Sequence, residues 1–137
     1  IWNFYWACKQ GRFKGIKGEN CLEWEAIQYY AEFLQTDCLM IGDFNFGPTF
    51  SQKAFIELTQ RLSALDMESL YHRFFSLPVS ESNHPTFVTT RNNEHHLDHV
   101  FGSGVYKKLL KTFKIGKLKD AILSDHAPLF LEFDIKN

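Results

Sequence analysis

Three of the six histidines of this chain, together with one aspartate, lie within five consecutive residues, His95-His96-Leu97-Asp98-His99. Imidazole and carboxylate groups are common ligands of transition metals, so the segment has the composition of a metal site. In a strand, however, side chains alternate between two faces, so His96 and Asp98 would point to one side and His95, Leu97 and His99 to the other. The segment is therefore either a metal site or the carrier of an aspartate with another role.

Polar side chains stand at the ends of apolar segments in three places. They are Asp43 and Asn45 in "IGDFN", Asp98 in "HHLDHVF", and Asp125 and His126 in "SDHAPLFLEF". Strands hold side chains rigidly while adjoining loops leave room for a ligand, so such ends suit a functional site. Each segment also has a structural interpretation, because Asp and Asn are frequent turn residues and a buried carboxylate can be satisfied by backbone amides. Taken singly, the segments do not decide between the two.

The apolar pattern predicts the elements that must position these residues. The continuous apolar run at 38–44 predicts a strand buried on both faces. One helix is predicted to begin with Asn20 as its cap, because Glu23, Ile27, Tyr30 and Leu34 recur at helical spacing. A second follows the Gly47-Pro48 turn, with Thr49 or Ser51 as its cap and a stripe of Phe55, Leu58, Leu62 and Leu65. Further strands are predicted at 1–8, 85–90, 96–101 and 127–135, with a basic loop at 9–19. The order β-α-β-α-β-β-β indicates an α/β or α+β layered sheet.

The overall composition narrows the class of protein. A chain of 137 residues with a formal net charge of −1 suits one globular domain and has no global basic field. One basic stretch, interpreted as a solvated face, comprises Lys107, Lys108, Lys111, Lys114, Lys117 and Lys119. The three cysteines, Cys8, Cys21 and Cys38, favour free thiols in a reducing compartment, so we expect a cytoplasmic location. No apolar run reaches membrane-spanning length.

The three polar segments, in this order, resemble the last three signature motifs of the endonuclease/exonuclease/phosphatase superfamily. "IGDFN", "HHLDHVF" and "SDHAPLFLEF" carry the resemblance, and "PTF" at 85–87 resembles bacterial members. The resemblance implies the four-layer α/β sandwich of the deoxyribonuclease-like fold, with a mixed, largely antiparallel sheet flanked by helices. It covers residues 1–137 as the C-terminal half of that domain. The start at Ile1 instead of Met also leads us to expect a preceding half.

The resemblance implies a role for each matching residue in metal-assisted cleavage of a phosphate ester. Asp43 would orient or deprotonate the attacking water, and Asn45 would hold that water or a phosphate oxygen. His126 would donate a hydrogen bond to a non-bridging oxygen as negative charge grows there. Asp98 would hold the other ring nitrogen of His126 and raise its pKa above the usual value of about 6.5. Asp125 would approach the divalent ion or its water shell.

The resemblance implies that the first half of the domain would supply most of the metal ligands. The resemblance implies Mg²⁺ or Mn²⁺, bound mostly by residues that precede this chain. Where the superfamily has a histidine or tyrosine, this sequence has Trp6, whose indole N–H could contact the phosphate but cannot act as an acid or base. The missing half, or a second chain, is expected to cover an apolar face.

Two functions remain open from the sequence. One is a metal-dependent phosphodiesterase or nuclease acting on a phosphate ester, with nucleic acid as one candidate substrate and phosphorylated head groups as another. The other is an inactive half-domain that serves as a binding or assembly module.

Overall fold

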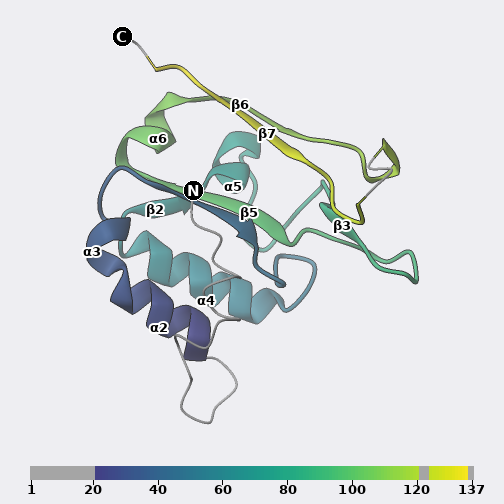
Figure 1. Cartoon of the computed structure of the whole chain (residues 1–137), viewed down its shortest axis with the longest axis horizontal. Coiled ribbons are helices and arrows are strands. Elements are labelled where there is room, and N and C mark those ends of the chain that lie inside the picture. Colours follow the sequence, from purple (N-terminus) through teal and green to yellow (C-terminus); the bar gives the residue numbers. More distant parts are fainter. Residues whose placement is uncertain (1–20, 121–123, 136–137) are drawn as a thin grey trace.

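The computed structural model describes residues 21–120 and 124–135. Their elements follow the chain as shown in Figure 1. They are α2 (Cys21–Tyr29), α3 (Ala31–Leu34), β1 (Leu39–Asp43), α4 (Gln52–Ser63), β2 (Met67–Ser69), α5 (Leu70–Phe75), β3 (Phe87–Val88), β4 (Glu94–His95), β5 (Asp98–Ser103), α6 (Gly104–Leu109), β6 (Leu110–Ile115), the 3₁₀ turn η1 (Leu118–Asp120) and β7 (Leu129–Phe133).

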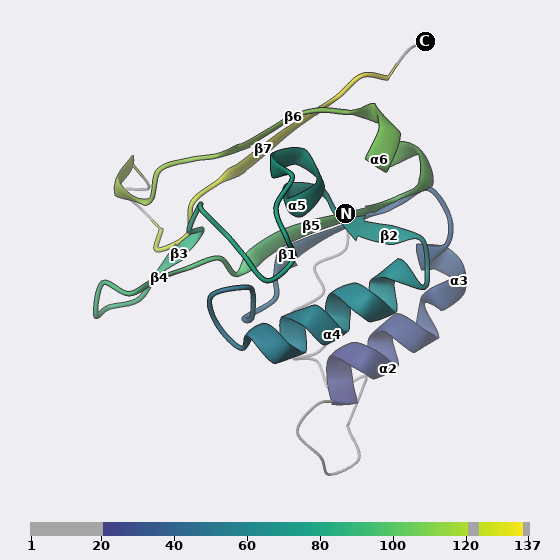
Figure 2. The ribbon, with the colours of Figure 1, turned by 180° about the vertical axis from the view of Figure 1, so that it is seen from behind.

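The elements form stacked layers around two cores. A three-stranded sheet of order β1-β5-β2 lies in the middle, with α2, α3 and α4 on one side and the β6-β7 pair on the other (Figure 2). The helix-side core includes the fully buried Phe55, Leu58 and Leu62 of α4, which lie on one face of that helix. Burying each such side chain contributes about 1.5–3 kcal/mol, so this stripe anchors α4 to the sheet.

The second core lies between the central sheet and the β6-β7 pair. Val100 of β5, Tyr71 of α5 and Phe113 of β6 are buried there, and the inward residues of β7 pack against them. All strand pairings in the described residues are antiparallel. The predicted α/β class, with antiparallel sheets flanked by helices, is confirmed.

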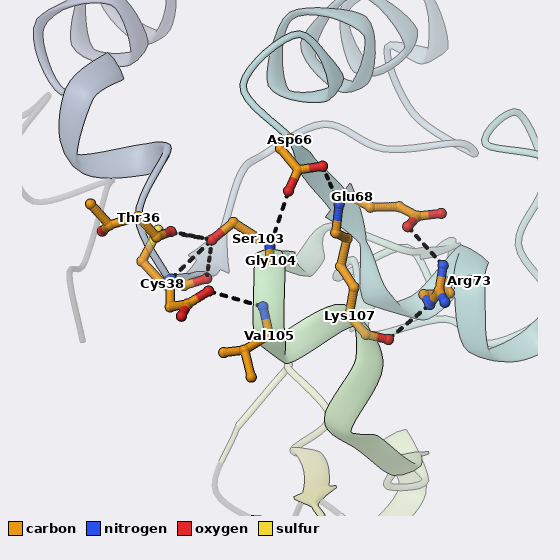
Figure 3. A network of polar contacts seen from close by, with 10 residues as sticks. Thr36, Cys38, Asp66, Glu68, Arg73, Ser103, Gly104, Val105 and Lys107 are labelled. Atoms are coloured by element: carbon orange, nitrogen blue, oxygen red, sulfur yellow. Dashed lines mark hydrogen bonds and ion pairs between the residues drawn. The ribbon is translucent and has the colours of Figure 1, made fainter.

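A polar network fixes the start of β1 to the end of β5 (Figure 3). The Ser103 hydroxyl donates to the Thr36 carbonyl and accepts the Cys38 amide at 2.9 Å. At the same end the Lys107 ammonium pairs with Asp66. Because β1 and β5 are antiparallel, anchoring this end sets the register of the opposite end, where β1 finishes and β5 begins.

Several predicted elements are present with different bounds. The strand at 38–44 is confirmed as β1, and the strand at 127–135 is shorter, as β7. The helix predicted to run from Asn20 to Leu34 is interrupted after Tyr29 and continues as α3. Ser51 does precede α4, as one of the two predicted caps, but its side chain makes no capping hydrogen bond. The long strand predicted at 85–90 is only the two-residue β3, paired with β4.

The lysine-rich stretch contains structure that the sequence did not reveal. Its lysines lie on α6, on β6, on η1 and in the turn between β6 and η1, and β6 pairs with β7. Lys111 and Lys114 are exposed on β6, whereas Phe113 between them is buried. β2, α5, α6 and β6 were all missing from the sequence-based prediction, which had interpreted 107–119 as a solvated face.

The remaining expectations, on cysteines, membrane spans and an exposed apolar face, can be compared with the described residues only in part. Cys38 is a buried free thiol, and burial raises its pKa. Within 21–120 and 124–135, no helix combines the length and apolarity needed to cross a bilayer. Phe130 and Ile135 are large apolar side chains with 57% and 69% exposure. The strand at 1–8, the loop at 9–19 and Trp6 lie outside the described residues. The cytoplasmic location and the covered apolar face stay predictions.

Candidate active site

Asp43 and Asp98 are brought together by the pairing of two strands. Asp43 is the last residue of β1, Asp98 is the first residue of β5, and the two are partners in the antiparallel register. The Phe44 amide donates to the Leu97 carbonyl at 2.9 Å, which extends the pairing beyond the strands. The two carboxylates therefore lie at the same end of the central sheet, opposite the network of Figure 3.

His126 contacts Asp98 directly. The Nδ1 atom of His126 lies 2.8 Å from Oδ2 of Asp98, and both side chains are partly buried, with 30% and 17% exposure. Burial alone would lower the pKa of His126, but the hydrogen bond to Asp98 and the charges of Asp98, Asp43 and Asp125 outweigh it and raise the pKa. A raised pKa keeps the imidazolium populated nearer to neutral pH, and its Nε2–H is then a donor toward a bound anion.

Thr86 joins two of the segments that form this arrangement, those of Asp98 and His126, although the sequence reasoning gave it no role. The Oγ1 atom of Thr86, which is fully buried, accepts the amides of Leu97 and Asp98, each at 3.0 Å. The Thr86 carbonyl accepts the Ala127 amide at 2.7 Å. One residue thus fixes the backbone beside both members of the Asp98–His126 pair. The only sequence signal for it was its place within "PTF".

The ring and backbone of His126 are held by neighbouring residues. Phe87 packs against the imidazole with ring centroids 4.8 Å apart and forms an isolated bridge with His126. The Ser124 hydroxyl accepts the His126 amide at 3.0 Å, and the Val88 amide donates to the Asp125 carbonyl at 3.0 Å. These contacts fix the segment before β7 against β3, so His126 is oriented before any substrate binds.

Asp43 sits in a tight turn with Asn45. The Asn45 amide donates to Oδ1 of Asp43 at 2.8 Å, and Asn45 has a positive φ of 57°, which asparagine tolerates better than most residues. Burial raises the pKa of Asp43, the Asn45 hydrogen bond opposes this, and the charge of Asp98 adds to the rise. The turn that was the structural alternative for this segment is real, and it leaves the Asn45 side chain exposed beside the Asp43 carboxyl.

The chain was compared with known families, curated proteins and solved structures, and only solved structures match it. No profile of a known protein family matches the chain. No curated protein matches it. Solved structures do, among them the 3′ phosphatase NExo from Neisseria bound to a product DNA hairpin, with a TM-score of 0.63 and 19% identity over 82% of this chain and 53% of that one. The 3′-5′ exonuclease NExo from Neisseria meningitidis matches with a TM-score of 0.59 and 19% identity, covering 82% of this chain and 55% of that one. The endonuclease domain of TRAS1, a telomere-specific non-LTR retrotransposon, matches with a TM-score of 0.58 and 15% identity, covering 84% and 50%.

These proteins are members of the endonuclease/exonuclease/phosphatase fold. This chain has the same fold. It spans about half the length of the solved structures that it matches. The resemblance predicted from the three motifs is therefore confirmed at the level of the fold.

The resemblance implies a divalent ion, but no complete site for it is found among the described residues. Carboxylates suit Mg²⁺ and Mn²⁺, and Asp43, Asp98 and Asp125 lie close enough to influence the same groups electrostatically. Even so, no group of three or more His, Cys, Asp or Glu side chains that could hold an ion is found among residues 21–120 and 124–135. The described part of the chain does not form a complete cation site by itself, and the metal role of Asp125, an exposed residue, stays a prediction.

Two histidines of the segment 95–99, His96 and His99, are buried in the protein. The rings of His96 and His99 stack with centroids 4.8 Å apart, and His99 also stacks on Phe55 at 4.4 Å. Burial lowers the pKa of His96 to about 4 and that of His99 well below 6.5. Stacked neutral rings inside a core act as packing groups, whereas Asp98 alone of this segment contacts His126.

Proposed function

We propose that this chain is part of a divalent-metal-dependent phosphoesterase of the nuclease type, with its reaction centre at Asp43, Asp98 and His126. The observation that carries the proposal is the Asp98–His126 hydrogen bond of 2.8 Å, located beside Asp43 at one end of the central sheet. A charged imidazole that is oriented by a carboxylate suits the stabilisation of negative charge on a phosphate oxygen.

Each residue has a defined part in the proposed reaction. His126, protonated through the influence of Asp98, donates from Nε2 to a non-bridging oxygen as the transition state gains charge. Asp43 accepts a hydrogen bond from the attacking water and takes its proton, which requires the ionised carboxylate. Asn45 contributes a neutral polar group that holds the water or a phosphate oxygen without repelling the anion. Asp98 is a positioning residue that acts through His126.

The proposal includes Mg²⁺ or Mn²⁺, which would neutralise phosphate charge when bound. Asp125 would contribute to its water shell, with the other ligands supplied by residues outside the described ranges, because the described residues do not complete the ion's site. Trp6 as a phosphate contact belongs to the same proposal.

The substrate class proposed is a phosphodiester of nucleic acid. Support comes from the fold neighbours, one of which is described as bound to a product DNA hairpin. This support is limited to the fold, since the identities are 19% and below.

Hydrolysis of bis(p-nitrophenyl) phosphate tests the proposal. The protein is expected to release p-nitrophenol in the presence of Mg²⁺ or Mn²⁺ and to lose about 10²-fold in turnover on His126→Ala or Asp43→Ala. Lys53→Ala, on the exposed side of α4, is the matched control for a surface substitution. If the intact natural protein is inert with metal, the chain is a binding or assembly module instead. If both variants retain the original rate while folded, the reaction centre does not include Asp43 and His126.

A further inference from the structure

A hollow of about 430 Å³ is lined by two segments that adjoin the backbone beside His126, and none of its lining residues belongs to the proposed reaction centre. One wall is formed by Asn83, His84 and Pro85, and the other by the segment 115–119, which follows β6. Glu94 of β4 borders the hollow as well. Figure 1 shows β3 and the end of β6 at the same end of the molecule, where β1 finishes and β5 begins.

Both walls are anchored to residues that flank His126. The first wall continues into Thr86, whose carbonyl accepts the Ala127 amide at 2.7 Å. In the second wall, the Gly116 amide donates to the Pro128 carbonyl at 2.8 Å. A side chain at Gly116 would meet the Pro128 ring at 2.8 Å, so the two segments are in close contact. The hollow is therefore fixed directly to the backbone that carries His126.

The first wall is also held by a buried residue. The hydroxyl of Tyr71, a fully buried residue, accepts the Asn83 amide at 3.0 Å and lies 3.0 Å from Nδ1 of His84. These bonds hold the first wall in place independently of Thr86. A site that is preformed in this way loses little ordering entropy when a ligand binds.

The lining has a defined chemistry. Lys117 and Lys119 are exposed cations on one wall, and Glu94 is an exposed carboxylate on the other. Pro85, Ile115 and Leu118 provide apolar surface between them. A nucleotide unit matches this lining, because its phosphate is anionic while its base has a flat apolar face and N–H donors. A compact polyanion such as a phosphorylated head group matches less well, since Glu94 would repel it.

We propose that this hollow is a subsite for a nucleotide that neighbours the scissile phosphate of a nucleic-acid strand, with Lys117 and Lys119 contacting its phosphate. The inference rests on the proposed function, because it assigns a binding place to a further nucleotide of the substrate proposed there. It gives Lys119 of η1 and Lys117, just before η1, a binding role, whereas the sequence had suggested only a solvated face.

The test is binding of a short fluorescein-labelled single-stranded DNA, measured by fluorescence anisotropy in EDTA over a range of salt concentrations. The full chain is compared with Lys117→Ala/Lys119→Ala and with the control Lys53→Ala/Lys108→Ala, which removes two exposed lysines from α4 and α6. The first pair is expected to weaken binding and to reduce the slope of log K against log salt by about 0.7, the value for one neutralised phosphate of a single strand. The control pair should leave both unchanged, and Lys117→Arg/Lys119→Arg should keep binding.

The inference is overturned if the original chain does not bind the oligonucleotide, or if the two alanine pairs lose affinity equally. It is also overturned if inositol hexakisphosphate competes more strongly than unlabelled DNA in a manner that depends on Lys117 and Lys119, which would mark a head-group site. Since EDTA prevents metal-dependent turnover, the outcomes are separable. DNA binding of the predicted kind with no phosphodiester hydrolysis refutes the proposed function alone, while hydrolysis with unaltered binding by the lysine variant refutes the subsite alone.

Discussion

Asp98→Asn removes the charge next to His126 while preserving the shape of the side chain. The amide oxygen that this substitution introduces can still accept a hydrogen bond from Nδ1, so the ring orientation is retained. The substitution removes the negative charge from the 2.8 Å hydrogen bond between Asp98 and His126, whose side chains are partly buried. A hydrogen bond to a charged group contributes about 1.5–3 kcal/mol, and tenfold in rate corresponds to about 1.4 kcal/mol, so turnover should fall about 10- to 100-fold.

The raised pKa of His126 also predicts how the rate of Asp98→Asn depends on pH. The pKa of His126 is raised by Asp98 against the opposing effect of burial, so the protonated donor persists as the pH rises above 6.5. The same logic applies to stability: the contribution of this pair is fully present below the unfolded pKa and is lost as the pH rises through the folded pKa. In Asp98→Asn the rate should decline at a lower pH than in the original protein.

The assay is a pH–rate profile with bis(p-nitrophenyl) phosphate, paired with an NMR titration of the His126 ring protons. Glu68→Gln is the matched control, because Glu68 is an exposed carboxylate that pairs with Arg73. It should leave the rate and the titration unchanged. If Asp98→Asn keeps the original rate and the original His126 titration while folded, Asp98 does not act through His126.

Three further predictions concern the scaffold. Thr86→Val leaves the amides of Leu97 and Asp98 without their acceptor and should lower the free energy of unfolding by about 2 kcal/mol or more, whereas Thr86→Ser should not; urea denaturation of both variants decides. Gly47→Ala would drive a methyl group against the His96 carbonyl and should cost about 3 kcal/mol or more, while Gly42→Ala, with no atom within 4 Å, should be tolerated in the same assay. Burial lowers the pKa of His72 and His96 to about 4. Because the unfolded chain binds these protons near pH 6.5 and the folded protein does not, each histidine should lower the free energy of unfolding by roughly 2 kcal/mol between neutral pH and pH 5. A urea midpoint that stays constant over this interval contradicts buried neutral histidines.

The pairing of Asp98 with His126 was implied by the resemblance of three motifs to a known superfamily, and no local pattern would have revealed it. The residues are 28 positions apart, and what joins them is the register of β1 with β5 and the contact of β3 with the segment before β7. Thr86 escaped prediction for the same reason. A threonine in a β-branched segment looks like an ordinary strand residue until its hydroxyl is seen to accept two amides from elsewhere in the chain.

The missed strand β6 has a different physical cause. All of its residues except Phe113 are exposed or partly exposed, Lys111 and Lys114 among them, so only Phe113 signals burial strongly. An irregularity in its pairing between Leu110 and Thr112 also breaks the period-two alternation. By contrast, β1 was predicted well because its apolar run is continuous, and α4 because its apolar residues recur at helical spacing over 12 residues.

The most direct test of the central claim is a double-mutant cycle between Asp98 and His126, read as turnover of bis(p-nitrophenyl) phosphate with Mg²⁺. If Asp98 acts through His126, the double variant Asp98→Asn/His126→Ala should be no slower than His126→Ala alone, because the partner that Asp98 serves is already gone. If the two losses multiply, the residues act independently, and a reaction centre built on their hydrogen bond is contradicted.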